Sequence, residues 1–157
     1  MLRATVGLIC WIALSLLAGV VGGVATGREA GAFYRELELP PFAPPGWVFG
    51  PVWTLLYLLM GVAVWLVWKP SGFAKARLPL SLFGVQLVLN ALWSWIFFAW
   101  WQPGWALVEI VVLWLAIVAT TIAFWRVRPT SGALLLPYLA WVSFAVVLNA
   151  AIWWLNA

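Results

Sequence analysis

The chain has 157 residues, of which 67% are apolar and 8% are charged, and its formal net charge is +4. Soluble domains carry charge on about a quarter of their residues, so the 8 basic and 4 acidic side chains here cannot cover a soluble particle of this size. This composition excludes an ordinary soluble enzyme, a disordered chain and a nucleic-acid-binding protein. The lack of histidine excludes histidine-based triads and histidine ligation of metal or haem, and the single cysteine, Cys10, excludes an intrachain disulfide and a cysteine-cluster metal site.

Five segments have the apolar length of about 20 residues that a transmembrane helix needs. They cover residues 4–26, 46–68, 78–101, 105–125 and 132–155. Because lipid offers backbone groups no hydrogen-bond partner, these segments are expected to be helices, and the alternating strands of a membrane barrel are not seen. A cleaved signal peptide is the less favoured interpretation of the first segment, since four further spans follow. The sequence predicts one all-α domain, residues 1–157, built as a bundle of five transmembrane helices.

Basic residues are divided unevenly between the two sides of this bundle. The N-terminus and the second and fourth connections share six of them, whereas the first connection holds Arg28 and Arg35 and the third holds none. The six are Arg3, Lys69, Lys75, Arg77, Arg126 and Arg128. The positive-inside rule therefore predicts a cytoplasmic N-terminus and a C-terminus outside.

The first connection, residues 27–45, is long for a five-span bundle. It contains three of the chain's four carboxylates and four of its ten prolines. The pairs Pro40-Pro41 and Pro44-Pro45 stiffen the backbone and prevent helix at those positions. A long, rigid and amphipathic connection is more often a lid or binding element than a simple link, so we expect a lid.

Polar residues form one stripe on the third span. Gln86, Asn90 and Ser94 follow one another at four-residue spacing and so share a helix face. Each is costly in lipid unless it is paired. The stripe is either hydrogen-bonding glue between helices or the lining of a cavity that receives a polar ligand end.

Aromatic residues share faces on the second and fifth spans. Trp53 and Tyr57 are four residues apart, and the fifth span repeats the pattern. Its shared face contains Tyr138, Trp141, Ala145 and Asn149. Aromatic residues at this spacing usually pack in a core or contact lipid, but an aromatic cavity with a few amides and one small residue would suit a large flat ligand.

Small residues on the first span predict close packing against another helix. Gly19 and Gly23 belong to a doubled GxxxG pattern, which permits packing within the chain and dimerisation equally. We expect a homodimer that uses these glycines or, on the third span, Ala91 and Ser94.

Glu109 is the one carboxylate inside a predicted span. It lies about one turn into the fourth span, where the helix dipole favours an anion, and is expected to reach the membrane interface. No second intramembrane acid or base accompanies it, which argues against a proton relay. Walker, HExxH and GxSxG motifs are also lacking.

Three long motifs resemble the TspO/MBR family, the tryptophan-rich sensory proteins related to the mitochondrial translocator protein (peripheral benzodiazepine receptor). They are FYRELELPPFAPPGWVFGPVWTLLYLLMG, QLVLNALWSWIFF and LPYLAWVSFAVVLN. The resemblance covers essentially the whole chain. It implies a five-helix bundle in a bacterial membrane, with the first connection as a lid over a pocket.

The resemblance also implies a ligand class. Members of this family bind tetrapyrroles such as protoporphyrin IX and haem-type compounds, as well as isoquinoline carboxamide and benzodiazepine-type drugs. Porphyrin would be a ligand here, and no cofactor would be obligatory. Carried over by motif, the ligand-binding residues would be Tyr34, Trp53, Tyr57, Gln86, Asn90, Trp141 and Ala145.

Two features of the family bear on catalysis and on sterol. Some members promote light-dependent porphyrin breakdown, and Trp53 and Trp141 would then be the catalytic residues. The family's sterol motif needs a tyrosine and a basic residue late in the fifth span, and VLNAAIWWLNA has neither. Strong sterol binding is therefore not expected.

Three functions remain open from the sequence. The leading hypothesis is a membrane receptor or translocator that binds tetrapyrroles and serves their regulation or transport. The alternative is a light-dependent porphyrin-degrading enzyme, in which the pigment supplies most of the chemistry. A small solute carrier is disfavoured, because the chain shows neither an inverted repeat nor a coupling-ion site.

Overall fold

The computed structural model describes residues 1–27 and 32–157 in full and the backbone alone through residues 28–31. Within this described chain, five helices are long and apolar enough to cross a membrane, which confirms the predicted all-α, five-span architecture. The elements are α1 (Leu2–Ala25), α2 (Arg28–Glu36), η1 (Gly46–Val48), α3 (Phe49–Lys75), α4 (Arg77–Ser94), η2 (Trp95–Ala99), α5 (Pro103–Val127) and α6 (Pro129–Leu155).

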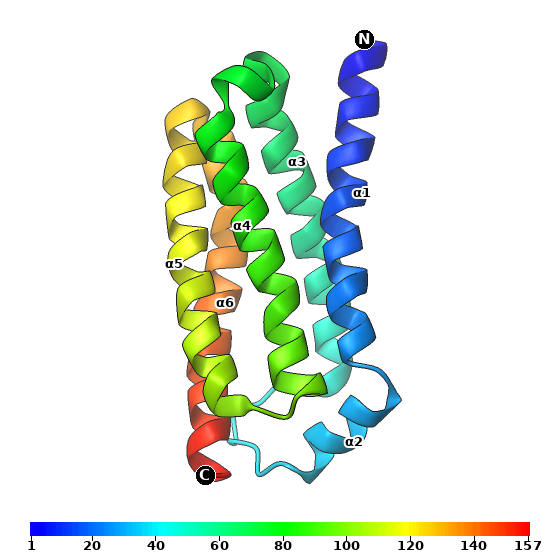
Figure 1. The fold of residues 1–157 in the computed structure, drawn as a ribbon, viewed down its shortest axis with the longest axis vertical. Coiled ribbons are helices and arrows are strands. Elements are labelled where there is room, and N and C mark those ends of the chain that lie inside the picture. Colours follow the sequence, from blue (N-terminus) through cyan, green and yellow to red (C-terminus); the bar gives the residue numbers. More distant parts are fainter.

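The five long helices run alternately up and down, as Figure 1 shows. The N-terminus lies at one end of the bundle, here called the N-terminal end, and α2 and the C-terminus lie at the other, the α2 end. Helix α1 packs against α3 and α4, α6 packs against α3 and α5, and α4 packs against α5, so the helices form a closed ring. The ring encloses an apolar core that includes Met60, Val64, Ile117 and Leu135.

Two of the spans end differently from the sequence prediction. Helix α3 does not end near Trp68 but continues to Lys75, with Pro70 inside it and a kink at Gly72. Gly72 has φ +63° and ψ −174°, a conformation that essentially only glycine adopts. At the α2 end, α4 passes into five π-helical residues, Trp95–Ala99, and π-turns of this kind are frequent at functional sites.

The connection predicted as a lid is partly helical. Residues 28–36 form α2, which the sequence analysis did not predict, whereas the proline-rich residues 37–45 contain no helix, as expected. Arg28, one of the two basic residues assigned to this side of the membrane, lies outside the residues whose side chains are described.

Small residues bring α1 close to its neighbours within one chain. A Cβ on Gly19 would lie 2.5 Å from the Tyr57 ring, and a Cβ on Gly22 would lie 3.2 Å from Ser94 Oγ and 3.7 Å from Ala91 Cα. Internal packing therefore occupies the space beside Gly19 and Gly22. Gly23 has open space beside it, with no atom within 4 Å of an added Cβ, and the dimer contacts stay a prediction.

Candidate functional site

A buried hydrogen-bond network joins α3, α4 and α6 at the centre of the ring. The Tyr57 hydroxyl donates to Asn90 Oδ1, and Asn90 Nδ2 donates to the Tyr138 hydroxyl at 2.8 Å. The Tyr138 hydroxyl donates in turn to Gln86 Oε1 at 2.8 Å. All four side chains are buried. In this conformation Gln86 and Asn90 act as glue between helices, and the third residue of the predicted stripe, Ser94, instead faces α1.

A third amide, that of Asn149, also serves helix packing. Asn149 Oδ1 accepts a hydrogen bond from Trp93 Nε1 at 3.0 Å, and Asn149 Nδ2 donates to the Pro103 carbonyl at 2.9 Å. These bonds fix the C-terminal half of α6 to α4 and to the start of α5. Asn149 is therefore fully engaged in structure.

An aromatic array extends from the network towards the α2 end. Trp53 stacks on Tyr57, with ring centroids 5.6 Å apart, and meets Tyr138 edge-on at 6.2 Å. One turn before Trp53, Phe49 contacts Trp141 at 5.9 Å and Tyr34 of α2 at 6.1 Å. We call this set of six rings, which spans α2, α3 and α6, the aromatic array.

The structure brings the sequence-predicted site residues into one part of the bundle. Tyr34, Trp53, Tyr57 and Trp141 belong to the aromatic array. Gln86 and Asn90 bond to its inner end through the tyrosine hydroxyls. Ala145, one turn beyond Trp141, packs against the same apolar core.

In this conformation the rings of the array pack in two sets, Trp53 with Tyr57 and Tyr138, and Phe49 with Tyr34 and Trp141. Two open surface cavities, of about 590 and 560 Å³, are lined by other residues. A flat ligand that entered between two rings of one set would have to separate them.

Helix α2 docks on the bundle through aromatic contacts that the sequence analysis missed. Phe33 stacks on Trp101, with centroids 5.3 Å apart and planes 4° from parallel, and meets Phe97 edge-on at 6.2 Å. Tyr34 also contacts Phe98 at 6.5 Å. The sequence analysis assigns Phe97, Phe98 and Trp101 only to the third span, because no local pattern indicates that a helix docks on them.

A pair of hydrogen bonds holds the other end of the connection. The Glu38 backbone N–H donates to Asn156 Oδ1 at 2.9 Å, and Asn156 Nδ2 donates to the Glu38 carbonyl at 3.0 Å. We call this pair the Asn156 clamp. It joins residues 118 positions apart and could not be read from the sequence.

Two polar groups in this half of the bundle are buried without a hydrogen-bond partner among the described residues: the Tyr34 hydroxyl and the Glu109 carboxyl. Burial raises the pKa of Tyr34, so its hydroxyl remains a donor. Glu109 is only 8% exposed, which corrects the expectation that it reaches the membrane interface. A buried polar group without a partner is unfavourable, so both groups would gain from a hydrogen-bond partner that a ligand supplied.

Glu109 lies between two apolar clusters along α5. Ala106, one turn earlier, packs with Phe97 and Leu148, whereas Leu113, one turn later, belongs to the main core. Within the described chain, no group of three metal-ligating side chains surrounds it. The arrangement offers stacking surfaces and single hydrogen bonds rather than metal coordination.

Comparisons with known proteins place the chain in a family. The sequence profile of the TspO/MBR family matches residues 11–155. The human translocator protein is 45% identical over 135 residues, which make up 85% of this chain and 80% of that protein. The tryptophan-rich protein TspO of Chlorobaculum tepidum is 43% identical over 149 residues, 92% of each chain. The tryptophan-rich sensory protein of Cereibacter sphaeroides is 36% identical over 138 residues, 87% of this chain and 85% of that protein. These matches confirm the resemblance noted from the motifs, and the chain belongs to the TspO/MBR family of multi-pass integral membrane proteins.

Proposed function

We propose that the protein binds a tetrapyrrole, protoporphyrin IX or a haem-type compound, within the aromatic array beneath α2. The observation that carries the proposal is the combination of two sets of packed aromatic rings with two buried polar groups that have no hydrogen-bond partner among the described residues. Flat conjugated ligands stack on such rings, and few polar groups are needed to orient them. Isoquinoline and benzodiazepine-type ligands have the same flat character and would share the site.

Each predicted residue has a role in this proposal. Trp53 and Trp141 supply stacking faces, and Ala145 leaves room beside Trp141. The Tyr34 hydroxyl donates to a carboxylate of the ligand, and the Glu109 carboxyl accepts from a pyrrole N–H. Tyr57, Gln86 and Asn90 form the polar inner end, where their mutual bonds would rearrange around the ligand.

The connection 27–45 acts as the lid in this proposal. Release of the Asn156 clamp and of the Phe33–Trp101 stack would let α2 swing away from the array. The names of the relatives, translocator protein and tryptophan-rich sensory protein, support a role in the transport or regulation of tetrapyrroles.

A titration tests the proposed binding. Protoporphyrin IX added to the purified protein is expected to quench tryptophan emission with saturation in the micromolar range, which corresponds to about 8 kcal/mol. The array contains two tryptophans that would contact the pigment directly. Unchanged emission at saturating porphyrin, after correction for the inner-filter effect, would contradict the proposal.

Light-dependent porphyrin degradation is the second candidate function. It is favoured by the stacking of Trp53 on Tyr57, whose hydroxyl is hydrogen-bonded to Asn90. Such a pair can donate one electron to an excited pigment, which leaves an oxidised indole or phenol and a reduced pigment, and breakdown of the pigment would then need molecular oxygen as the oxidant. Illumination separates the candidates, because a binder leaves the porphyrin spectrum intact whereas a degrading enzyme converts the pigment to a defined product.

Variants locate the electron donor if degradation occurs. Trp53→Phe and Trp141→Phe keep a flat ring but remove the easily oxidised indole, so pigment loss should collapse while affinity falls little. Trp65→Phe is the control, since Trp65 Nε1 bonds to the Ala4 carbonyl at 2.8 Å, away from the array. Equal pigment loss in all three variants would remove the enzymatic interpretation.

Orientation and assembly complete the proposal. The distribution of lysine and arginine supports a cytoplasmic N-terminus, an outer C-terminus and a lid on the outer side. A homodimer is also proposed, and Gly23 is its favoured contact on α1 because a Cβ added there meets no atom within 4 Å. Sterol is not a proposed ligand.

A further inference from the structure

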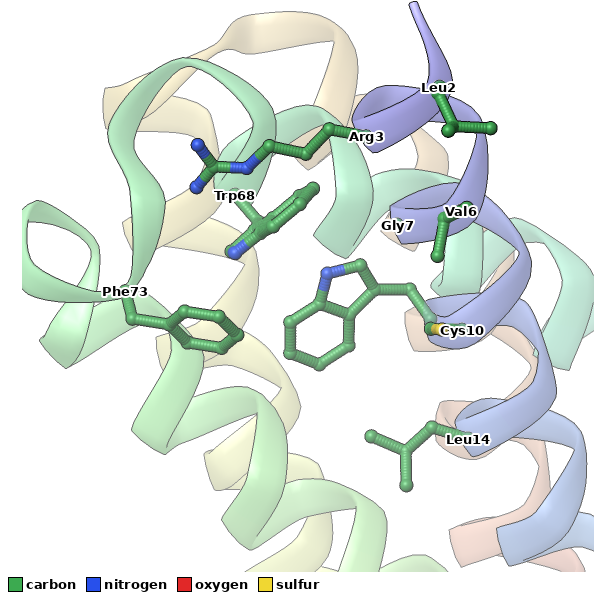
Figure 2. Close-up of a pocket in the computed structure, with 9 residues that line it drawn as sticks. Leu2, Arg3, Val6, Gly7, Cys10, Leu14, Trp68 and Phe73 are labelled. Carbon is green, nitrogen blue, oxygen red and sulfur yellow. The ribbon is translucent and has the colours of Figure 1, made fainter.

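An open cavity of about 590 Å³ lies at the N-terminal end of the bundle (Figure 2), whereas the aromatic array extends towards the α2 end. Helix α1 forms one wall with residues from Leu2 to Leu14, and Trp68 and Phe73 of α3 form the other. We call this cavity the α1–α3 groove. None of the residues assigned to tetrapyrrole binding lines it.

Two backbone features shape the groove. Gly7 lies against the six-membered part of the Trp68 indole, where any added Cβ would collide with the ring. The kink at Gly72 is followed by Phe73, whose ring lies 6.2 Å from Trp11 and 5.9 Å from Trp68. The Trp68 indole nitrogen is thereby turned away from α1, between the Arg3 guanidinium and the Phe73 ring, as Figure 2 shows.

The groove has hydrogen-bond donors without acceptors. Trp68 is 9% exposed, and its Nε1 is buried with no hydrogen-bond partner among the described residues. The Arg3 guanidinium lies 5.7 Å from the centre of the same ring. Indole and guanidinium groups only donate, and no carboxylate, amide or hydroxyl side chain lines the groove. An occupant must therefore bring the acceptor.

The charge around the groove favours an anion. Three of the chain's four carboxylates lie in the connection 27–45, and the fourth, Glu109, lies early in α5, near the α2 end. The basic residues at the N-terminal end thus have no carboxylate nearby in the sequence. They include Arg3, Lys69, Lys75 and Arg77. The remaining walls are apolar and include Trp11. Leu14 and Phe73 lie below the guanidinium in Figure 2.

We propose that the α1–α3 groove binds an anionic phospholipid. Its phosphate and ester oxygens accept hydrogen bonds from Arg3 and from Trp68 Nε1, and one acyl chain lies over Trp11, Leu14 and Phe73. A zwitterionic lipid has the same acceptors, but the surplus of basic groups at this end favours a headgroup with net negative charge.

Native mass spectrometry of the full chain tests the selectivity. Phosphatidylglycerol and phosphatidylcholine with identical acyl chains are titrated separately, and phosphatidylglycerol is expected to bind about fivefold more tightly. Arg3→Gln should reduce that preference at least twofold, whereas Trp68→Phe removes a donor that both lipids can use and should weaken the binding of both. Arg128→Gln is the matched control, because it removes the same charge at the same end but lies outside the groove, and it should keep the preference.

The outcomes that would overturn the proposal are equally definite. Equal binding of the two lipids to the parent protein, or an unchanged preference in Arg3→Gln, would contradict it. Arg3 is exposed and lies in the first turn of α1, so this variant does not disturb the core even if Trp68→Phe fails to fold.

Cys10 provides a second and independent measurement. It is the chain's single cysteine, it is exposed, and it lines the groove. Phosphatidylglycerol should slow alkylation of Cys10 by N-ethylmaleimide at least threefold relative to phosphatidylcholine, and Arg3→Gln should remove this protection. Equal alkylation rates with the two lipids would show that the acyl chain does not occupy the groove.

Discussion

The three tyrosines of the chain form a natural series for testing the buried network. Among the described residues, the Tyr34 hydroxyl makes no hydrogen bond, the Tyr57 hydroxyl makes one and the Tyr138 hydroxyl makes two. Replacement by phenylalanine removes only the hydroxyl and keeps the ring. A side-chain hydrogen bond in a membrane protein contributes about 0.6 kcal/mol on average. The expected losses of stability are therefore about 0.6 kcal/mol for Tyr57→Phe, about 1.2 kcal/mol for Tyr138→Phe and none for Tyr34→Phe.

The partners left behind preserve this order. Tyr138→Phe leaves Asn90 Nδ2 and Gln86 Oε1 unpaired, whereas Tyr57→Phe leaves only Asn90 Oδ1, and each orphaned buried group adds a further cost. Tyr34→Phe removes a hydroxyl that has no partner, so it should be neutral or slightly stabilising. Reversible unfolding in mixed detergent, measured for the ligand-free protein, gives the three free energies. A destabilisation by Tyr34→Phe as large as that of Tyr138→Phe would refute the hydrogen-bond assignment.

Three further predictions concern the lid and the backbone. Asn156→Ala removes both bonds of the Asn156 clamp, and replacement of Pro44 and Pro45 by glycine frees the lid backbone. Each change should speed porphyrin release several-fold in stopped-flow measurements, and unchanged dissociation rates would count against a lid. Gly61→Leu should destabilise the fold by about 1–3 kcal/mol or more, because a Cβ there would lie 2.6 Å from the Ile12 Cα, whereas Gly23→Leu should leave unfolding unchanged and affect only a dimer detected by crosslinking. Gly72→Ala should cost about 1–3 kcal/mol through backbone strain, and an unfolding midpoint equal to that of the parent would contradict the kink.

The sequence predicted the architecture because the spans are set by hydrophobic length alone. Five apolar segments could fold only as helices in lipid, and the polar stripe of Gln86 and Asn90 had to face other helices. Helix ends were less predictable. Pro70 suggests an end, but the local backbone accommodates it, and Gly72 rather than Pro70 carries the kink.

Tertiary packing accounts for what the sequence could not show. Helix α2 is stabilised by the contacts of Phe33 with Trp101 and Phe97, which come from a distant part of the chain. The burial of Glu109 likewise depends on which face of α5 turns inward. The GxxxG pattern could not distinguish internal packing from dimerisation, and the closeness of Gly19 to Tyr57 decides that position.

Similar reasoning applies to the site. The motif correctly grouped residues that lie together, since Trp53, Tyr57 and Trp141 belong to one array. It could not reveal that aromatic rings of the site pack against one another in this conformation, or that Gln86 and Asn90 are hydrogen-bonded to the tyrosine hydroxyls. Which of these contacts open for a ligand is a property of the whole bundle and its lid.

The most direct measurement of the central claim compares protoporphyrin IX binding by two variants in which an alanine of α6 is replaced by phenylalanine. Ala145→Phe places a ring beside Trp141 in the partly buried interior, whereas Ala140→Phe adds the same ring on an exposed face of the same helix. Binding within the aromatic array predicts at least a tenfold loss of affinity, about 1.4 kcal/mol, in Ala145→Phe and parent-like affinity in Ala140→Phe, with both proteins folded by circular dichroism. Parent-like affinity in Ala145→Phe would contradict the account.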